Sequence, residues 1–295
     1  MKKFIIVEVG STTTKSYLYE NNTIKELDMV VIPFKADYKK DNRINEYNKK
    51  MLFNFIKSIK EKNIFVYGTS IFRNLNNIER ESWIKEFKYN TGFDFMVVTP
   101  DMENEYTVYG VINDIDYDAK IAIMIGGGGS TELSIVENGK IIEKANSSFG
   151  AIDIVESYPD LKEDKATTDY DFMINETKKL VNVPKNKADL LVLAGGNYIY
   201  FYEELKYPIE KNKFYKDVLQ PYCIDRESMD IFDKKFFYDM SLDEIGKRTN
   251  KDSWWRGTRG MRICVEALVQ VLDAKYIIPT KINMVYGIAE ILKNK

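Results

Sequence analysis

The 295-residue chain has 44% apolar residues, which is enough for two domains of ordinary size with separate buried cores. Its 43 Lys and Arg almost balance its 45 Asp and Glu, so no global positive field recruits nucleic acid. The chain has no histidine, the commonest general base and metal ligand. Any catalysis must therefore use carboxylates, bound cations, Lys, Arg or backbone amides.

The cysteines and the apolar runs bear on the compartment. Cys223 and Cys264 lie far apart in the sequence and form no C-x-x-C pair, which favours a reduced, cytoplasmic protein. The apolar run at residues 4–7 is interrupted by Glu8 before it reaches the length of a signal-peptide core. No stretch approaches the roughly 18 apolar residues of a membrane span. We therefore expect neither a membrane nor a nucleic-acid partner. The sequence leaves open whether the chain forms a homodimer.

The N-terminal segment predicts a hairpin with a third strand. An apolar strand at residues 4–9 runs into the turn GSTTT (residues 10–14), and two strands separated by an Asn-Asn turn follow up to residue 32. The same order returns at residues 120–144, where the turn is GGGGST (residues 126–131) and the later turn is Asn-Gly. This pattern indicates an internal duplication.

Alternating helices and strands fill the rest of the chain. Helical periodicity marks residues 48–62, 79–89, 261–272 and 284–292, and short apolar strands are predicted at residues 64–67, 93–98, 189–194 and 276–278. This alternation predicts an α/β fold with crossover helices. The acidic segment DIDYD (residues 114–118) separates the two copies. We therefore expect an N-terminal domain at residues 1–116 and a C-terminal domain at residues 117–295.

The two glycine and hydroxyl turns are candidate phosphate sites. Such turns let successive backbone N–H groups converge on one cluster of anionic oxygens. A single turn of this kind is more simply a tight hairpin, but its duplication favours phosphate binding. Neither turn matches the Walker or the Rossmann pattern. The candidate ligands are Ser11, Thr12, Gly127, Gly128, Gly129 and Ser130.

Seven segments resemble, in the same order, the exopolyphosphatase and guanosine pentaphosphate phosphohydrolase (Ppx/GppA) family. The segments are EVGSTTTK (8–15), YGTSIFRN (67–74), VTPDMENEYTVYGV (98–111), IGGGGSTELSI (125–135), SSFGAIDI (147–154), LAGGNYIY (193–200) and VYGIAEIL (285–292). The first and fourth are similar to the family's two phosphate loops. The similarity spans almost the whole chain, and the second phosphate loop is its most specific part.

The resemblance implies two actin-like (ribonuclease H-like) α/β domains with an interdomain cleft, in a short form of the family. It implies removal of the terminal phosphate of inorganic polyphosphate or guanosine pentaphosphate by metal-assisted water attack, with Mg²⁺ as the cofactor. By position, Glu103 matches the catalytic glutamate and Glu132 the second glutamate after the glycine loop. Glu8 and Glu132 are the candidate metal ligands. Arg73 follows a strand end, where a guanidinium can bind phosphate oxygens.

Simpler roles exist for these residues, and the sequence departs from the family at one acid. Glu103 also suits the first turn of a helix, and Arg73 suits a solvent-facing position. Members usually begin both phosphate loops with Asp, whereas Glu8 and Ile125 stand here, and Ile125 cannot hold a cation. A hydrolase and a catalytically weak polyphosphate- or nucleotide-binding sensor therefore both stay open. The sequence does not choose the substrate or the chain length.

A basic run near residue 255 is a candidate track for a long polyanion. Its members are Lys247, Arg248, Lys251, Arg256, Arg259 and Arg262. Asp252 is its one acidic interruption, Trp254 and Trp255 lie within it, and Arg256 and Arg259 are spaced to share a helical face. A solvated charged face is the alternative interpretation.

Overall fold

The computed structural model describes residues 2–41, 43–69, 71–113, 120–195, 198–211, 213–214, 222–249 and 257–294. These residues form two compact units, one of residues 1–106 with 285–295 and the other of residues 107–284. The C-terminal helix α12 (Met284–Lys293) thus adds most of its length to the first unit. The acidic segment at residues 114–118, near which the sequence places the domain boundary, lies outside the described residues.

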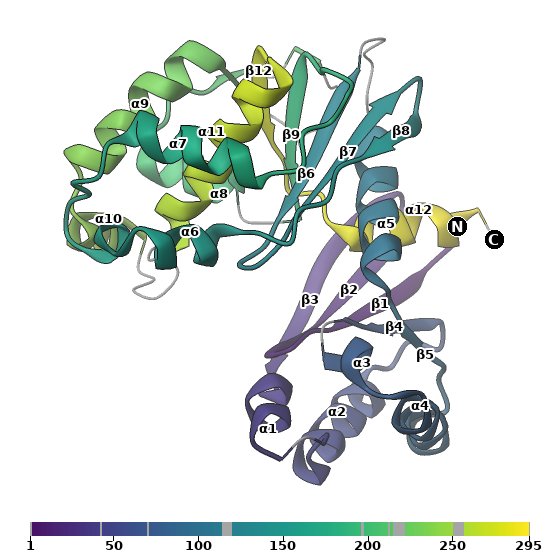
Figure 1. Ribbon diagram of the computed structural model, residues 1–295. Coiled ribbons are helices and arrows are strands. Elements are labelled where there is room, and N and C mark those ends of the chain that lie inside the picture. Colours follow the sequence, from purple (N-terminus) through teal and green to yellow (C-terminus); the bar gives the residue numbers. More distant parts are fainter. Residues whose placement is uncertain are drawn as a thin grey trace. The chain divides into compact units, whose positions relative to one another are not determined.

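The first unit is built on a five-stranded mixed sheet in the order β3-β2-β1-β4-β5 (Figure 1). The strands are β1 (Phe4–Val9), β2 (Thr13–Glu20), β3 (Thr23–Val31), β4 (Ile64–Gly68) and β5 (Phe95–Val97). β1, β4 and β5 are parallel, whereas β2 and β3 run antiparallel as a meander. Asn21 and Asn22 both have positive φ, 54° and 59°, as the predicted hairpin turn requires.

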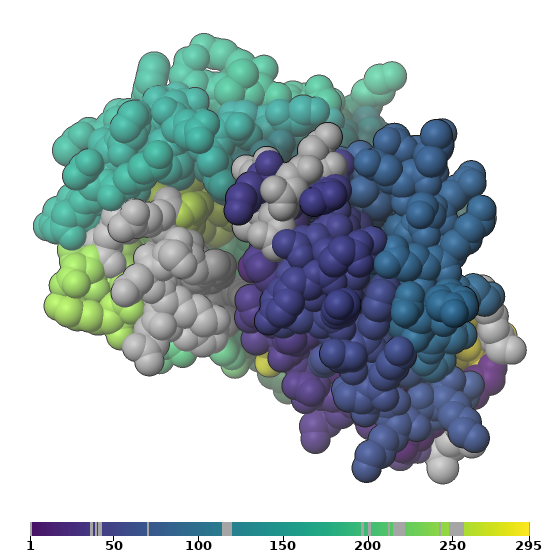
Figure 2. All heavy atoms as spheres, turned by 90° about the horizontal axis from the view of Figure 1, so that it is seen from below, coloured from purple at the N-terminus to yellow at the C-terminus, as the bar shows by residue number. Residues whose placement is uncertain are grey.

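The helices of the first unit are α1 (Phe34–Asp41), α2 (Glu46–Ser58), α3 (Ile71–Asn74), α4 (Asn77–Thr91), the first half of α5 (Pro100–Ile112) up to Tyr106, and α12 from Val285 on. Helices α1 to α4 pack on the sheet of this unit in one apolar cluster. Alternate β1 residues Ile5, Val7 and Val9 are buried in one apolar cluster with Trp83 and Phe87 of α4. Figure 2 shows the first unit from the side of its helices, where the indigo and blue side chains of α2 and α4 cover the sheet.

The second unit repeats this plan and extends it. Its strands are β6 (Ile121–Gly126), β7 (Thr131–Glu137), β8 (Lys140–Lys144), β9 (Leu190–Ala194), β10 (Glu210–Lys211), β11 (Tyr222–Asp225) and β12 (Tyr276–Pro279). The order is β10-β11-β12-β9-β6-β7-β8, so β8-β7-β6-β9-β12 has the order and strand directions of the first sheet. Asn138 and Gly139 again have positive φ, 51° and 69°. The predicted duplication of the strand order is confirmed.

The helices of the second unit pack around one long buried helix. They are α6 (Ala151–Ser157), α7 (Tyr170–Leu180), α8 (Tyr198–Leu205), α9 (Arg226–Tyr238), α10 (Leu242–Thr249) and α11 (Thr258–Leu272), with a 3₁₀ turn at Pro159–Lys162. α11 crosses α6 so closely that a Cβ on Gly260 would lie 2.2 Å from the carbonyl oxygen of Ala151. No helix among the described residues has the length and apolarity needed to cross a membrane.

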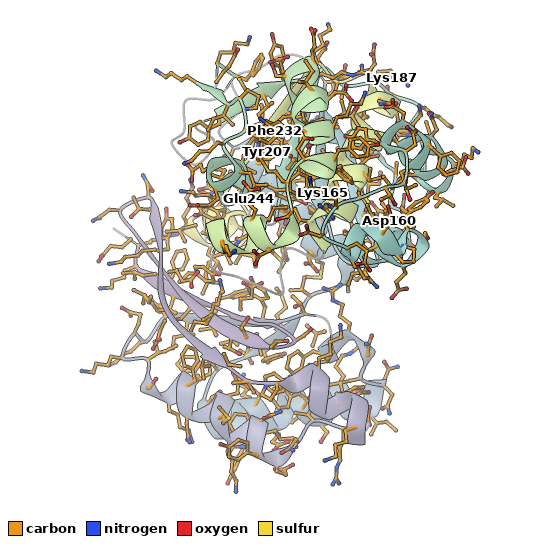
Figure 3. All side chains as sticks on the ribbon, turned by 90° about the vertical axis from the view of Figure 1, so that its left-hand side faces the viewer. Asp160, Lys165, Lys187, Tyr207, Phe232 and Glu244 are labelled. Atoms are coloured by element: carbon orange, nitrogen blue, oxygen red, sulfur yellow. The ribbon has the colours of Figure 1, made fainter. Side chains whose placement is uncertain are left out.

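The core of the second unit contains a buried charged network. Arg262 of α11 donates to Asp233 of α9 through Nε at 3.0 Å and Nη2 at 2.7 Å, and both side chains are almost fully buried. Tyr202 accepts from Arg262, and Tyr207 donates to Asp233. The rings of Tyr207 and Phe232 pack together, with 4.1 Å between their centroids (Figure 3). Such a network satisfies two buried charges that would be costly apart.

The structure contradicts the polyanion track at two of its arginines. Arg259 is fully buried and donates to the carbonyl oxygens of Glu163, Asp164 and Met240 at 2.8–3.0 Å. Arg262 is held by Asp233. Their guanidinium groups hold the core together instead of facing a ligand, so that interpretation is wrong for both. Arg256, Trp254 and Trp255 lie outside the described residues.

The buried network gives a stability prediction. Arg262→Met leaves the Asp233 carboxylate buried without its counter-ion, so we expect the free energy of unfolding to fall by about 3–5 kcal/mol. The measurement is urea-induced unfolding of the full chain. The matched control is Lys247→Met, because Lys247 pairs with Asp243 on the surface of α10 and such pairs contribute within about 1 kcal/mol. Equal losses in the two variants would contradict a special role of the buried pair.

Candidate active site

The two glycine and hydroxyl turns have the same backbone geometry. The N–H of Gly10 donates to the carbonyl of Thr13 at 2.9 Å, and the N–H of Gly127 donates to the carbonyl of Ser130 at 2.9 Å. Each bond closes a hairpin just beyond the last paired residues of its two strands. The N–H of Gly127 is therefore used inside its turn.

A helix is tied to each turn by the same kind of hydrogen bond. The N–H of Lys35, the second residue of α1, donates to the carbonyl of Ser11 at 2.9 Å, and the N–H of Ile152, the second residue of α6, donates to that of Gly128 at 2.8 Å. In the second unit the approach is tight, because a Cβ on Gly150 would lie 2.5 Å from the carbonyl oxygen of Gly127. Both turns are thereby held against the start of a helix.

Glu8 lies in a polar row across the first sheet. Its strand neighbours are Lys15 on β2 and Tyr67 on β4, and residues paired in register share a face. Tyr17, two residues beyond Lys15, donates to Glu8 Oε2 at 3.4 Å. Burial raises the pKa of Glu8, Lys15 opposes this shift, and the charge of Glu103 raises the pKa further. The site thus disfavours the charge on Glu8 unless a cation offsets it.

Glu103 and Arg73 form an ion pair in the first unit. Arg73 Nη2 contacts Glu103 Oε2, and the two side chains keep 24% and 35% of their exposure, so solvent reaches both. Arg80 fixes the backbone beneath this pair by donating to the carbonyls of Arg73 at 2.9 Å and Leu75 at 3.0 Å. The Nε of Arg73 is buried without a hydrogen-bond partner among the described residues. The predicted catalytic glutamate and the predicted phosphate-binding arginine are thus brought together.

These residues share one edge of the first sheet. Glu8 lies near the end of β1, Arg73 lies in the short helix after β4, and Glu103 lies in the first turn of α5 after β5. Because β1, β4 and β5 are parallel, their carboxyl ends meet at one edge, which is where ligands bind in open α/β sheets. Thr99 caps α5 by accepting from the N–H of Met102 at 3.2 Å through Oγ1.

The second unit carries its acid on the neighbouring strand. Ile125 of β6 occupies the place that Glu8 has on β1, and Glu132 of β7 is paired directly with Ile125, as Lys15 is with Glu8. Ser130 Oγ donates to Glu132 Oε1 at 2.7 Å, so the hydroxyl of the turn orients this carboxylate. The side chain of Ile125 lies against Gly195, whose φ is +77°. Asn197, in the segment at residues 193–200 that resembles the family's third glycine loop, lies outside the described residues.

Three side chains that the sequence did not single out support these sites. Tyr17 contacts Glu8, Arg80 supports Arg73, and Asp153 of α6 accepts from the N–H of Gly150 through Oδ2 at 2.8 Å. A Cβ on Gly129 would lie 3.9 Å from Asp153 Oδ2, which places an acid next to the glycine turn. The sequence contains a pattern for two of them. Residue 17 alternates with residue 15 on the same face of a strand, and residue 153 has the capping-box spacing from residue 150.

Comparison with known proteins places the chain in a family. The sequence model of the Ppx/GppA phosphatase family matches residues 34–198, more than half of the chain. The chain belongs to the Ppx/GppA phosphatase family. It is also 28% identical over 146 residues to the bifunctional 3-dehydroquinate synthase/phosphatase of Fusobacterium nucleatum. This stretch is 47% of the chain but only 22% of that relative, so the chain matches a small part of a longer protein.

Solved structures of Ppx/GppA proteins have the same fold. The Aquifex aeolicus family member covers 99% of this chain and 98% of its own at 17% identity, with a TM-score of 0.77. An exopolyphosphatase from Cytophaga hutchinsonii covers 99% and 98% at 15% identity, with a TM-score of 0.72. At such identities the likeness shows the fold alone. The expected family is confirmed, and so is the expected α/β fold class.

The docking of α6 on the second turn gives a prediction. The backbone of Gly150 has φ −149° and ψ −167°, which any residue adopts, so Gly150→Ala acts only through the clash of its Cβ with the turn. We expect it to cost about 1–3 kcal/mol of unfolding free energy, measured by urea denaturation. Gly257→Ala is the matched control, because nothing lies within 4 Å of a Cβ there. A cost at Gly150 no larger than at Gly257 would contradict the tight docking.

Proposed function

We propose that the chain is a phosphoanhydride hydrolase that removes the terminal phosphate of inorganic polyphosphate or of guanosine pentaphosphate. The observation that carries the proposal is the grouping of Glu8, Arg73 and Glu103 at the carboxyl ends of three parallel strands of the first unit. Membership of a phosphatase family supports it. In the proposal, Ser11 and Thr12 of the first unit and residues 128–130 of the second unit each bind phosphoryl oxygens, whereas the N–H of Gly127 is already bonded to Ser130.

Mg²⁺ fits the donor set as a cation shared with the substrate. Among the described residues, no three acidic, histidine or cysteine side chains gather closely enough to form an all-protein metal cage. Mg²⁺ commonly uses one or two carboxylates and completes its shell with water and substrate phosphates. The proposed metal ligand of the first unit is Glu8, whose pKa is raised by burial and by Glu103, and that of the second unit is Glu132, which Ser130 orients. When bound, the ion would offset negative charge on the phosphoryl oxygens.

The remaining chemistry is assigned to Glu103 and Arg73. Glu103 accepts a proton from the attacking water, the water oxygen forms a bond to the terminal phosphorus, and the bridging P–O bond breaks. The bridging oxygen leaves on the shortened chain. Arg73 holds the Glu103 carboxylate in place through their ion pair, and its other N–H groups are donors for a phosphoryl oxygen. The pair thus positions the base beside a phosphate-binding group.

The assignment of Glu103 is tested by phosphate release. Glu103→Gln keeps the shape of the side chain but removes its basicity, so kcat should fall by about 10²-fold or more while KM changes little. The assay uses polyphosphate and guanosine pentaphosphate separately, with and without Mg²⁺. Glu105→Gln, an exposed position on the same helix, is the control. A kcat of Glu103→Gln within a few-fold of that of the unmodified chain would contradict the role of Glu103 as the general base.

The role of Glu8 is tested by the Mg²⁺ dependence of the rate. Glu8→Gln removes a charged ligand but keeps a carbonyl oxygen, so the Mg²⁺ concentration for half-maximal rate should rise by about tenfold, or roughly 1.4 kcal/mol. Glu20→Gln, at the far end of β2, is the control for the loss of one acid from the same sheet. An unchanged Mg²⁺ dependence in Glu8→Gln would remove Glu8 from the metal site.

A catalytically weak sensor of polyphosphate or nucleotides is the second candidate. Ile125, which packs against Gly195 where the family usually has an acid, is the observation that favours it. The same assay separates the two functions, because a sensor binds polyphosphate without releasing phosphate at any Mg²⁺ concentration.

A further inference from the structure

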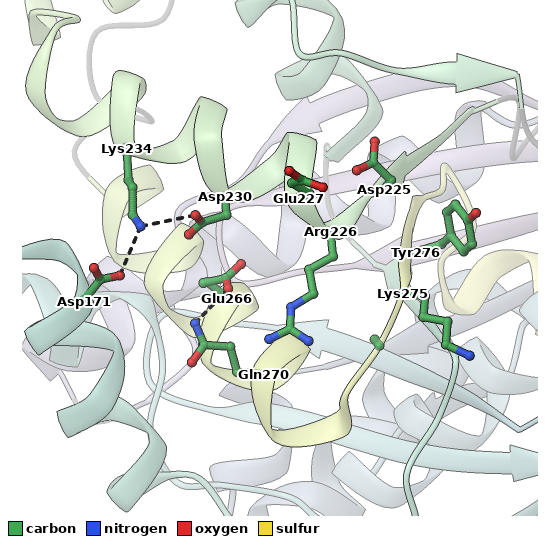
Figure 4. A pocket seen from close by; sticks show the side chains of 11 residues that line it. Asp171, Asp225, Arg226, Glu227, Asp230, Lys234, Glu266, Gln270, Lys275 and Tyr276 are labelled. Carbon is green, nitrogen blue, oxygen red and sulfur yellow. Dashed lines mark hydrogen bonds and ion pairs between the residues drawn. The ribbon is translucent and has the colours of Figure 1, made fainter.

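The second unit has a charged pocket away from its glycine turn. The pocket has a volume of about 640 Å³, within the range of small-molecule sites (Figure 4). It is formed by α7, α9 and α11 together with the segments around β11 and β12. The lining residues are Asp171, Asp225, Arg226, Glu227, Asp230, Lys234, Glu266, Gln270, Ala274, Lys275 and Tyr276.

The charge balance of the pocket favours a cation. Five carboxylates and three cationic side chains line it, which leaves two negative charges when all the acids are ionised. Lys234 lies between Asp171 and Asp230, at 3.3 and 3.2 Å. The other two cations form ion pairs with carboxylates outside the lining: Arg226 with Asp273 at 3.1 Å and Lys275 with Asp189 at 2.9 Å. All three cations of the pocket are thus already in ion pairs, whereas two of its five carboxylates, Asp171 and Asp230, share the single cation Lys234.

Glu266 of α11 supplies a buried acceptor without a donor. The residue is 1% exposed, and its Oε1 accepts from Gln270 Nε2 at 2.9 Å. Its Oε2 is buried and has no hydrogen-bond partner among the described residues. A buried carboxylate oxygen left without a donor is costly. Figure 4 shows the carboxylate between Asp230 and Gln270, on the side of the pocket.

We propose that this pocket binds a small organic dication, a linear diamine or polyamine, with one ammonium group donating to Glu266 Oε2. An ammonium group has only donors, which matches an acceptor that lacks one. Two positive charges match the net charge of the lining. A bare metal ion fits less well, because no compact set of three acidic, histidine or cysteine ligands exists among the described residues. The ligand must instead reach acids that are spread over the pocket.

The pocket should respond to pH near neutrality. Burial raises the pKa of Glu266 to about 7, and Asp233 and Asp230 raise it while Gln270 and Arg262 lower it. The other charged groups that surround this carboxylate are Asp171, Lys178, Asp225, Arg226, Glu227, Lys234 and Lys275. Since the pKa is raised, Glu266 is neutral below about pH 7 and charged above it. Alkylammonium groups, with a pKa near 10, stay charged throughout. Binding should therefore strengthen as the pH rises.

Isothermal titration of the full chain with putrescine and with spermidine tests the proposal. We expect a Kd below about 1 mM at pH 8 and about tenfold weaker binding at pH 6, because the ionised fraction of Glu266 falls from roughly nine-tenths to roughly one-tenth. Glu266→Gln should weaken binding at pH 8 by about tenfold and abolish the pH dependence. Asp243→Asn, which removes an exposed acid of α10 outside the pocket, should change neither.

Each other outcome counts against the site. Absence of binding by both amines, unchanged affinity in Glu266→Gln, or an equal loss in Asp243→Asn would overturn the proposal, the last because it indicates diffuse charge attraction. Mg²⁺ is titrated in parallel, and competition at equal concentration would indicate an unspecific cation site. If Glu266→Gln does not fold, Asp230→Asn takes its place. That variant removes a lining acid but leaves the Lys234–Asp171 ion pair, and it should also weaken binding severalfold.

Discussion

The hydrogen bond between each hairpin turn and the helix beside it is the constraint on which the candidate site depends. In both units the second residue of a helix donates its backbone N–H to the first central residue of the turn, at 2.9 Å for Lys35 and Ser11 and at 2.8 Å for Ile152 and Gly128. The bond fixes the turn relative to the end of the central parallel strands. It also explains the glycine at residue 150, where the two backbones approach too closely for a side chain. The same backbone hydrogen bond therefore fixes the position of the turn in both units, and the units differ in the side chains around that turn.

The two copies use that frame differently because their acids sit on different strands. In the first, Glu8 lies opposite Lys15 in the strand register, burial raises the pKa of Glu8, Lys15 lowers it, and the charge of Glu103 raises it further. In the second, Ile125 replaces the acid of the central strand, but its direct partner is Glu132, which Ser130 orients. A cross-strand swap keeps a carboxylate on the same face of the sheet. The second unit therefore still has a carboxylate beside Ile125, although Ile125 itself has none.

The sequence predicted the parts of the fold that rest on local patterns. The turns at residues 21–22 and 138–139 and the duplicated strand order follow from turn chemistry and alternation, and both are present. It failed for Arg259 and Arg262, because their burial depends on carbonyls of residues 163, 164 and 240 and on Asp233, all distant in sequence. The Arg73–Glu103 ion pair was missed for the same reason. Local sequence patterns predict the type of each element and the positions of turns. Ion pairs between distant elements depend on how those elements pack, which local patterns do not contain.

The second unit contains more than the duplicated frame. Among the described residues, β10, β11, α9 and α10 have no counterpart in the first unit, and they lie between α8 and α11 in the chain. α9 brings Asp233 to Arg262, so this insertion is tied to the core by a buried charged network. The outer side of the same helix carries Arg226, Asp230 and Lys234, which line the pocket over Glu266. One turn further along α11 than the buried arginine, Glu266 faces an inserted helix instead of the glycine turn. The insertion therefore adds a ligand-sized, acidic surface without altering the strands that carry the candidate active site.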